Sequence, residues 1–252
     1  MNLADNINIL ADFCGIRDVD ELSTKALNTK YNLKQADVMV LFGGSILAGG
    51  DVLAEAIKTQ IAKIYIIVGG AGHTTEALRQ QFNKICPRVE VSNLSEAEIF
   101  NAYLNEFYNI SADYLECKST NCGNNITNLI ELIERENINC QSIILTQDST
   151  MQRRMTAGLK KYHSEILAIN FAAYQAKVIE KDSSLVYEAE ILGMWDIERY
   201  VSLLLGEIPR LTDDSNGYGP NGKNFIAHVD IPQNVQSAFN ELRKFFETRK
   251  IL

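Results

Sequence analysis

Short apolar runs alternate with helical patterns through the middle of the chain. The runs Val38–Phe42 and Ile64–Val68 have apolar or aromatic side chains at successive positions, and each ends in Gly-Gly. The segments "SIILTQ" (142–147) and "EILAINF" (165–171) read as two further strands. Strands that are apolar on both faces are typical of parallel sheets covered by helices on both sides. We therefore predict an α/β fold with a Rossmann-like, doubly wound, mainly parallel sheet.

Weaker patterns predict the elements between and after these strands. "RVEV" (88–91) reads as a third, shorter strand, and "YLEC" (114–117) as a fourth. Ser95 followed by Glu98 is a capping-box pattern that opens a helix. The long pattern from Ser184 to Leu205 predicts a single helix.

Both ends of the chain have helical patterns outside the alternating region. We predict a ligand-binding α/β domain over 37–182, and a smaller helical subdomain built from 1–36 and 183–252. The segment 207–224 is rich in Gly, Pro, Asp and Asn, which indicates an ordered loop. Its Tyr218 either forms a wall over a cleft or belongs to a rigid loop that locks the C-terminal helix onto the sheet.

Composition narrows the class of partner. A net charge of −8, with no block of Lys and Arg, argues against a nucleic-acid partner. No apolar run approaches the roughly 20 residues that a membrane helix needs, and no signal-peptide pattern opens the chain. The 5 cysteines show no CxxC spacing, which indicates reduced thiols rather than disulfides or a zinc site. We expect a cytoplasmic protein with a small-molecule ligand; the oligomeric state does not follow from the sequence.

Two glycine loops come directly after the first two strands. Gly43 and Gly44 follow the first strand, and Gly70 and Gly72 follow the second. Glycine lets backbone N–H groups approach an anion closely at the start of a helix, but it also serves in any tight turn. Neither loop is a complete dinucleotide fingerprint, because Thr75 stands where a third glycine is needed, and no Walker motif is present.

Ligands of parallel sheets bind outside the carboxyl ends of the strands, so titratable residues near these ends are candidates for chemistry. We select His73, Glu96 and Asp148 as acid–base candidates. His73 is equally consistent with a turn histidine exposed to water. Glu96 and Asp148, together with Asp51 and Glu116, can form an acidic cluster for a metal or an amino group; the alternative is that they cap helices. We assign no metal site.

Uncharged amides and one arginine complete the predicted ligand site. Asn121 and Asn125 lie in "ECKSTNCGNNI", where they either bind a polar ligand or cap a helix. Glu116 opens the same stretch and is included as a ligand contact. Arg153 lies early in a helix that follows "TQDST", where it binds a carboxylate or phosphate bidentately, or is simply solvated.

Five stretches resemble the YdcF-like branch of the SanA/ElyC/YdcF superfamily of bacterial proteins of uncertain function. They are "GGAGHTT", "STNCGNN", "QDSTMQRRM", "ERYVSLLLGEIPRLTDDSNGYGP" and "FIAHVDIP". The resemblance implies a Rossmann-like domain, a helical part from both chain ends, and a cleft between them that binds S-adenosylmethionine. Relatives linked to the cell envelope carry a membrane anchor, for which this chain shows no pattern. The pocket residues carried over by motif are Gly43, Gly70, His73, Glu96, Glu116, Asn121, Asn125, Asp148 and Arg153.

This chain departs from the branch at one position. Asn124 stands where the motif Ser-x-Asn-x-x-Glu-Asn has glutamate, which puts catalysis in doubt if that carboxylate is catalytic. Our leading hypothesis is a protein that binds a nucleotide-type small molecule such as S-adenosylmethionine. The alternatives are a non-catalytic sensor, and a hydrolase or transferase acting on a phosphorylated or envelope-derived metabolite.

Overall fold

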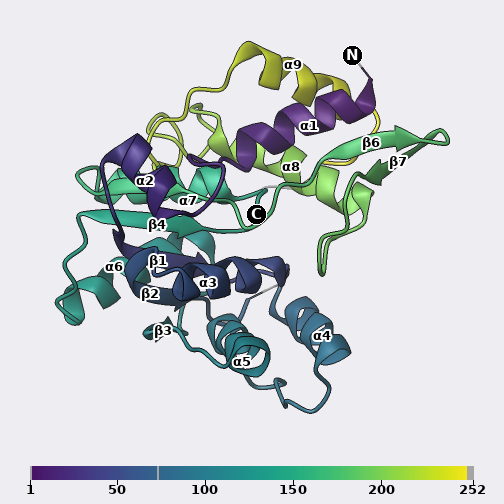
Figure 1. Cartoon of the computed structure of the whole chain (residues 1–252). Helices are drawn as coiled ribbons and strands as arrows, with labels where there is room; N and C mark the ends of the chain where they lie inside the picture. Colours follow the sequence, from purple (N-terminus) through teal and green to yellow (C-terminus); the bar gives the residue numbers. More distant parts are fainter. Residues whose placement is uncertain (1, 73, 249–252) are drawn as a thin grey trace.

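The computed structural model describes residues 2–72 and 74–248 of the chain (Figure 1). The helices are α1 (Leu3–Cys14), α2 (Thr24–Tyr31), α3 (Ala48–Lys58), α4 (Thr75–Ile85), α5 (Glu96–Tyr108), α6 (Cys122–Arg135), α7 (Gln152–Tyr162), α8 (Ile197–Leu211) and α9 (Gln233–Leu242). The strands are β1 (Ala36–Phe42), β2 (Ala62–Val68), β3 (Tyr114–Glu116), β4 (Ser142–Thr146), β5 (Leu167–Asn170), β6 (Val178–Lys181) and β7 (Ser184–Tyr187).

The main sheet has the strand order β3-β2-β1-β4-β5, and all its strands are parallel. In the central strand β1, Val40 pairs with Ile66 of β2 on one side and with Leu145 of β4 on the other. The chain moves outward from β1 to β3 and then returns to the other side of β1 at β4. The predicted Rossmann-like α/β fold is confirmed.

Helices cover both faces of this sheet, as the apolar strands predict. Met39 and Leu41 of β1 pack in a cluster with α2, α3, α4 and α5, whereas Val38, Val40 and Phe42 pack with α6 and α7. Every residue of β1 is buried. Because successive side chains of β1 point to opposite faces of the sheet, they contribute to two separate hydrophobic cores.

A third core joins the two ends of the chain. Ile7 and Leu10 of α1 pack with Tyr200 and Leu204 of α8 and with Phe239 of α9. Figure 1 shows these three helices together on one side of the sheet, opposite α4 and α5. Helix α2 differs, because its Leu27 packs in the sheet core. The exact domain boundaries stay a prediction.

Two predicted elements are wrong. Residues 88–91 form no strand, because β3 occupies the edge next to β2; Val91 is nevertheless buried in the chain that links α4 to α5. The predicted helix from Ser184 to Leu205 begins with strand β7, which pairs with β6 in a hairpin. Asp182 and Ser183 both have positive φ, the conformation that a two-residue hairpin turn requires. Helix α8 starts only at Ile197.

Candidate functional site

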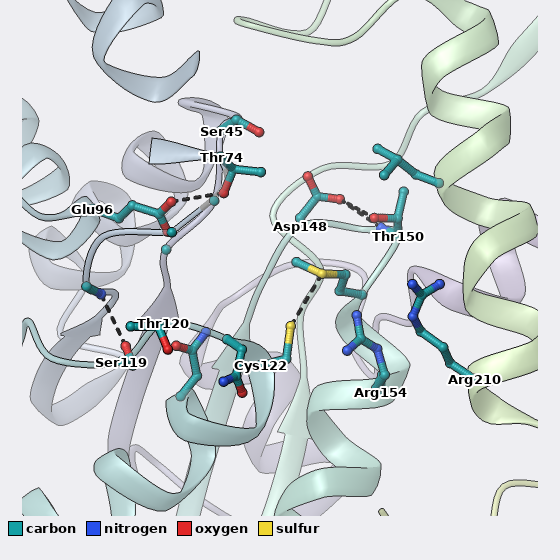
Figure 2. A pocket seen from close by; sticks show the side chains of 18 of the residues that line it. Ser45, Thr74, Glu96, Ser119, Thr120, Cys122, Asp148, Thr150, Arg154 and Arg210 are labelled. Carbon is teal, nitrogen blue, oxygen red and sulfur yellow. Dashed lines mark hydrogen bonds between the residues drawn. The ribbon is translucent and has the colours of Figure 1, made fainter. Parts of the chain in front are cut away.

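A cleft with a volume of about 290 Å³ opens at the carboxyl ends of β1, β2 and β4 (Figure 2). Gly43 and Gly44 follow β1, and Asp148 follows β4. The strand order reverses between β1 and β4, which is where doubly wound sheets bind ligands. Residues of α6, α7, α8 and the loop after α8 close the other side.

The predicted glycines Gly43, Gly44, Gly70 and Gly72 all line this cleft. The N–H groups of three of them donate to the protein itself: Gly43 to Val68 O (2.6 Å), Gly70 to Ser119 Oγ (3.1 Å) and Gly72 to Thr75 Oγ1 (2.7 Å). A Cβ at position 70 would lie 2.2 Å from Ser119 O, so two loops cross there at backbone contact. These glycines let the loops pack together, and their role in binding a cofactor stays a prediction.

Glu96 forms the acidic side of the cleft. It is the first residue of α5, whose predicted capping box between Ser95 and Glu98 is present. Its Oε1 accepts hydrogen bonds from the hydroxyls of Thr74 and Thr75, both at 2.9 Å. Burial raises the pKa of the Glu96 carboxyl, against the opposing effect of these hydroxyls. A buried carboxyl with a raised pKa at a cleft is a candidate for proton transfer or for binding a cation.

Asp148 is a second buried carboxyl, on the loop that follows β4. Its Oδ1 accepts from Thr150 N (2.9 Å), Thr150 Oγ1 (2.8 Å) and the hydroxyl of Tyr174 (2.7 Å). Burial raises the pKa of Asp148, and the charge of Glu207 adds to the effect. Because Oδ1 alone accepts these three bonds, the carboxyl is held in one orientation at the cleft.

Arginines occupy the side of the cleft opposite Glu96. Arg154 of α7 forms a bidentate ion pair with Glu207 of α8, with Nε–Oε2 at 2.6 Å and Nη2–Oε1 at 2.9 Å. Arg199 and Arg210 of α8 also line the cleft, and Arg199 lies 5.7 Å from the ring of Trp195. Figure 2 shows Arg154 and Arg210 across the cavity from Glu96. Guanidinium groups are the side chains that bind carboxylate and phosphate groups bidentately, so this wall is a candidate site for an anionic group.

Arg153, predicted as a ligand contact, does not line the cleft. Its guanidinium lies 4.1 Å from the centre of the Phe13 ring, and its Nε donates to Phe13 O. Adjacent residues of a helix point about 100° apart, so Arg153 faces α1 while Arg154 faces the cleft. The arginine dipeptide therefore reaches the cleft through Arg154 and not through Arg153.

Glu116, also predicted as a ligand contact, lies outside the cleft lining. Its carboxylate accepts from the backbone N–H groups of Lys118 (2.7 Å) and Ser119 (3.2 Å), and from Asn128 Nδ2 (3.1 Å). It fixes the loop that carries Ser119 and does not line the cleft. Asp51 is also remote, because its Oδ1 accepts from the hydroxyls of Tyr103 and Tyr108. The predicted acidic cluster of four carboxyls is therefore reduced to Glu96 and Asp148.

The predicted amides Asn121 and Asn125 line the cleft. Asn121 is also the N-cap of α6, and its Oδ1 accepts from Asn124 N at 3.0 Å, so the capping role holds as well. Asn124 is the third residue of α6 and lies outside the cleft lining. A glutamate at this position would complete a capping box with Asn121. The glutamate of the YdcF-like motif can therefore be explained by helix capping, without a catalytic role.

His73 lies outside the residues that the structure describes. Its neighbour Thr74 lines the cleft. Within residues 2–72 and 74–248, no three His, Cys, Asp or Glu side chains gather as a metal site would require.

Five residues that were not predicted for the site line the cleft or bond to residues that do: Arg199, Arg210, Glu207, Trp195 and Tyr174. Glu207 and Arg210 had a usable signal, because they are charged residues inside the apolar helical run "LLLGEIPRL". Charged residues are rarely buried unless they are paired, so such an interruption indicates a partner or a site. Tyr174 and Trp195 are distant from the glycine loops in the sequence, and no local pattern marks them.

The variant Glu96→Gln tests how the buried Glu96 carboxyl affects the stability of the protein at different pH values. The folded protein raises the Glu96 pKa above its ordinary value of 4.5. The contribution of this group to stability is therefore complete below about pH 4.5 and is lost as the pH rises through the folded-state pKa. Glutamine does not titrate, so we expect the melting temperature of the variant, relative to wild type, to rise between pH 4 and pH 7.

Glu98→Gln is the matched control on the same helix. Hydrogen bonds from Ser95 lower the pKa of Glu98, so this variant should lose stability relative to wild type over the same pH range. Thermal unfolding followed by circular dichroism at several pH values measures both differences. If the melting temperatures of both variants, relative to wild type, changed in the same direction with pH, burial would not disfavour the ionised form of Glu96.

No helix in the described part of the chain is long and apolar enough to cross a membrane. No protein-family model matches the chain.

Proposed function

We propose that this protein binds a nucleotide-type small molecule in the cleft, with an anionic group of the ligand against Arg154, Arg199 and Arg210. The observation that carries the proposal is the arrangement of charge: arginines on one wall face the buried carboxyls Glu96 and Asp148 across the switch point of the sheet. Such clefts at the carboxyl ends of parallel strands are the usual ligand sites of doubly wound folds.

Helix ends support an anionic group at the same place. The first turns of α6 and α7 meet the cleft at Asn121, Cys122 and Met151. The N-terminus of a helix carries a partial positive charge, which favours phosphate or carboxylate there. Together with the guanidinium groups, these ends select a ligand with a negative group on the α7–α8 side.

S-adenosylmethionine is the ligand of this class that we put forward first. Its carboxylate suits the arginine wall, by which we mean Arg154, Arg199 and Arg210. Its ammonium and sulfonium charges suit Glu96 and Asp148. The YdcF-like resemblance of the sequence motifs supports the same choice. The chain has no Gly-x-Gly-x-Gly run of the usual methyltransferase kind, so the proposal concerns binding and not methyl transfer.

Trp195 makes this proposal testable without a label. It is the single tryptophan of the chain and lines the cleft, so its fluorescence reports occupancy there. We expect titration with S-adenosylmethionine, adenosine monophosphate and inorganic phosphate to identify a ligand of this class. Arg199→Ala should weaken its binding about ten-fold, as expected for loss of a hydrogen bond to a charged group.

Arg243→Ala is the matched control. Arg243 also lies over an aromatic ring, 5.5 Å from the centre of Phe239, but it is outside the cleft lining. Its replacement should leave the dissociation constant unchanged. Equal effects of the two variants, or no fluorescence response to any of these ligands, would contradict the proposed function.

A second candidate is acid–base chemistry on the bound ligand, as in a hydrolase or transferase. It is favoured by the raised pKa of both Glu96 and Asp148 at one cleft. A protonated carboxyl can donate a proton to a leaving group, and its ionised form can accept one. A sensor without turnover uses the same charged walls, and product analysis after incubation with the identified ligand separates the two.

A further inference from the structure

A second hollow, with a volume of about 500 Å³, lies next to the cleft. We call it the aromatic groove; it lies between α6, α7 and the loop after α8. Asn121, Cys122, Arg154 and Tyr218 line both the cleft and the groove. The two hollows are therefore neighbours that meet at these four residues, and a ligand that occupies both has to pass Arg154.

Three aromatic side chains, Tyr162, Tyr218 and Phe225, line this groove. Tyr162 and Phe225 line it and remain 52% and 54% exposed, although large apolar side chains are usually buried. Tyr218 lies edge-to-face with Phe225, with ring centres 5.3 Å apart. Exposed aromatic rings gathered in a hollow indicate a binding surface rather than scattered surface residues.

The backbone holds these rings in place. Phe225 N and Ile226 N both donate to Tyr218 O, at 2.8 and 3.0 Å, and Tyr218 N donates to Arg210 O at 2.9 Å. Ala227 N donates to Ala157 O of α7 at 2.9 Å. The aromatic wall is thus attached to both helices that carry the arginines, and its distance from the arginine wall is set by the fold.

The rim of the groove is polar on the α6 side. Asn121, Asn124 and Thr127 line it and carry amide or hydroxyl groups. Rings on one side and hydrogen-bonding groups on the other suit a planar heteroaromatic ring, which stacks by its face and bonds by its edge. The amides of Asn121 and Asn124 bond to each other, and each amide keeps further donor or acceptor positions for the edge of such a ring.

We infer that the aromatic groove binds the heteroaromatic base of the ligand whose charged part lies in the cleft. The inference rests on the proposed function and adds a second subsite to it. The occupant is a purine-type base, stacked against Phe225 or Tyr162, with the anionic end of the same molecule reaching Arg154.

The test compares adenosine monophosphate with ribose 5-phosphate, which lacks the base, by Trp195 fluorescence. We expect adenosine monophosphate to bind at least about ten-fold more tightly. Phe225→Ala and Tyr162→Ala should together weaken adenosine monophosphate about ten-fold and leave ribose 5-phosphate unchanged. Phe245→Ala is the control, because Phe245 is 66% exposed and lines neither hollow.

The outcomes separate this inference from the proposed function. If both compounds bind equally and Phe225→Ala has no effect, the base subsite is wrong while the cleft proposal stands. If octyl phosphate bound more tightly than adenosine monophosphate, and if this binding depended on Phe225, the groove would bind an aliphatic chain and not a base. That result would overturn the inference. If neither compound binds, and neither phosphate nor S-adenosylmethionine changes the fluorescence, both the subsite and the nucleotide proposal are wrong.

Discussion

Arg154→Met lowers the free energy of unfolding by about 3–5 kcal/mol at pH 7, the effect expected when one partner of a buried ion pair is removed. The side chains of Arg154 and Glu207 are 11% and 2% exposed, so water cannot replace the lost partner. Methionine preserves most of the volume, which leaves the stranded carboxylate of Glu207 as the main cause. Urea unfolding followed by Trp195 fluorescence and circular dichroism measures the change.

Two further variants identify the cause. Arg153→Met, one residue earlier, removes a ring contact and a hydrogen bond to Phe13 but strands no buried carboxylate, so its effect should be about 1 kcal/mol. Adding Glu207→Leu to Arg154→Met should restore most of the stability, because both charges are then gone. Equal losses in Arg153→Met and Arg154→Met would contradict the assignment.

The ion pair also connects stability with the cleft. Glu207 accepts hydrogen bonds from Nε and Nη2 of Arg154. These two bonds fix the plane of the guanidinium group, which lies at the boundary between the cleft and the aromatic groove. A fixed arginine loses little conformational freedom when it binds an anion. Under the proposed function the pair orients the guanidinium group for the anion, so the double variant should be folded yet bind the anion poorly.

The alternation of strands and helices could be predicted because each signal is local. Successive apolar residues in Val38–Phe42 require helices on both faces, and the two cores that result are present. Ser95 and Glu98 form the capping box that their spacing indicates. Since every parallel strand ends at the same edge, the location of the cleft followed from the strand assignments alone.

The positions that the sequence does not predict correctly depend on contacts with distant parts of the chain. Whether Arg153 or Arg154 faces the cleft depends on where α1 packs against α7, which the sequence of α7 does not record. Glu116 looked like a ligand residue because it follows a strand, yet its acceptors are used by its own loop. Asp182 and Ser183 form a hairpin turn without the glycine or asparagine that usually marks one.

Glycine loops are ambiguous for the same reason. A run such as "VGGAG" fits both a phosphate site and a close crossing of two segments of one chain. Only the residues that surround the glycines in the folded protein distinguish these two roles. At Gly70 the neighbour is the backbone of the loop 117–119, which comes to within 2.2 Å of where a Cβ would be. The glycine is required by packing, and this requirement leads to a sharp test.

Gly70→Ala should destabilise the protein by about 3 kcal/mol, at the upper end of typical overpacking effects. A Cβ at this position would lie 2.2 Å from Ser119 O and 2.8 Å from Cys117 O. Both atoms are backbone, which cannot rotate away as a side chain can, so the loop itself must move. That movement would break the bond from Gly70 N to Ser119 Oγ and displace Asn121 at the cleft.

Gly44→Ala is the control within the same cleft. A Cβ there would lie 3.5 Å from Gln147 Oε1, an ordinary contact, so we expect stability to be unchanged or to rise by about 0.4–1 kcal/mol. Urea unfolding gives both values, and Trp195 fluorescence gives ligand binding in the folded variants. Because Gly70 sets the position of the loop that carries Asn121, Gly70→Ala should also weaken binding. If instead Gly70→Ala were as stable as Gly44→Ala, the close crossing of the two loops would be wrong, and with it the geometry of the cleft floor.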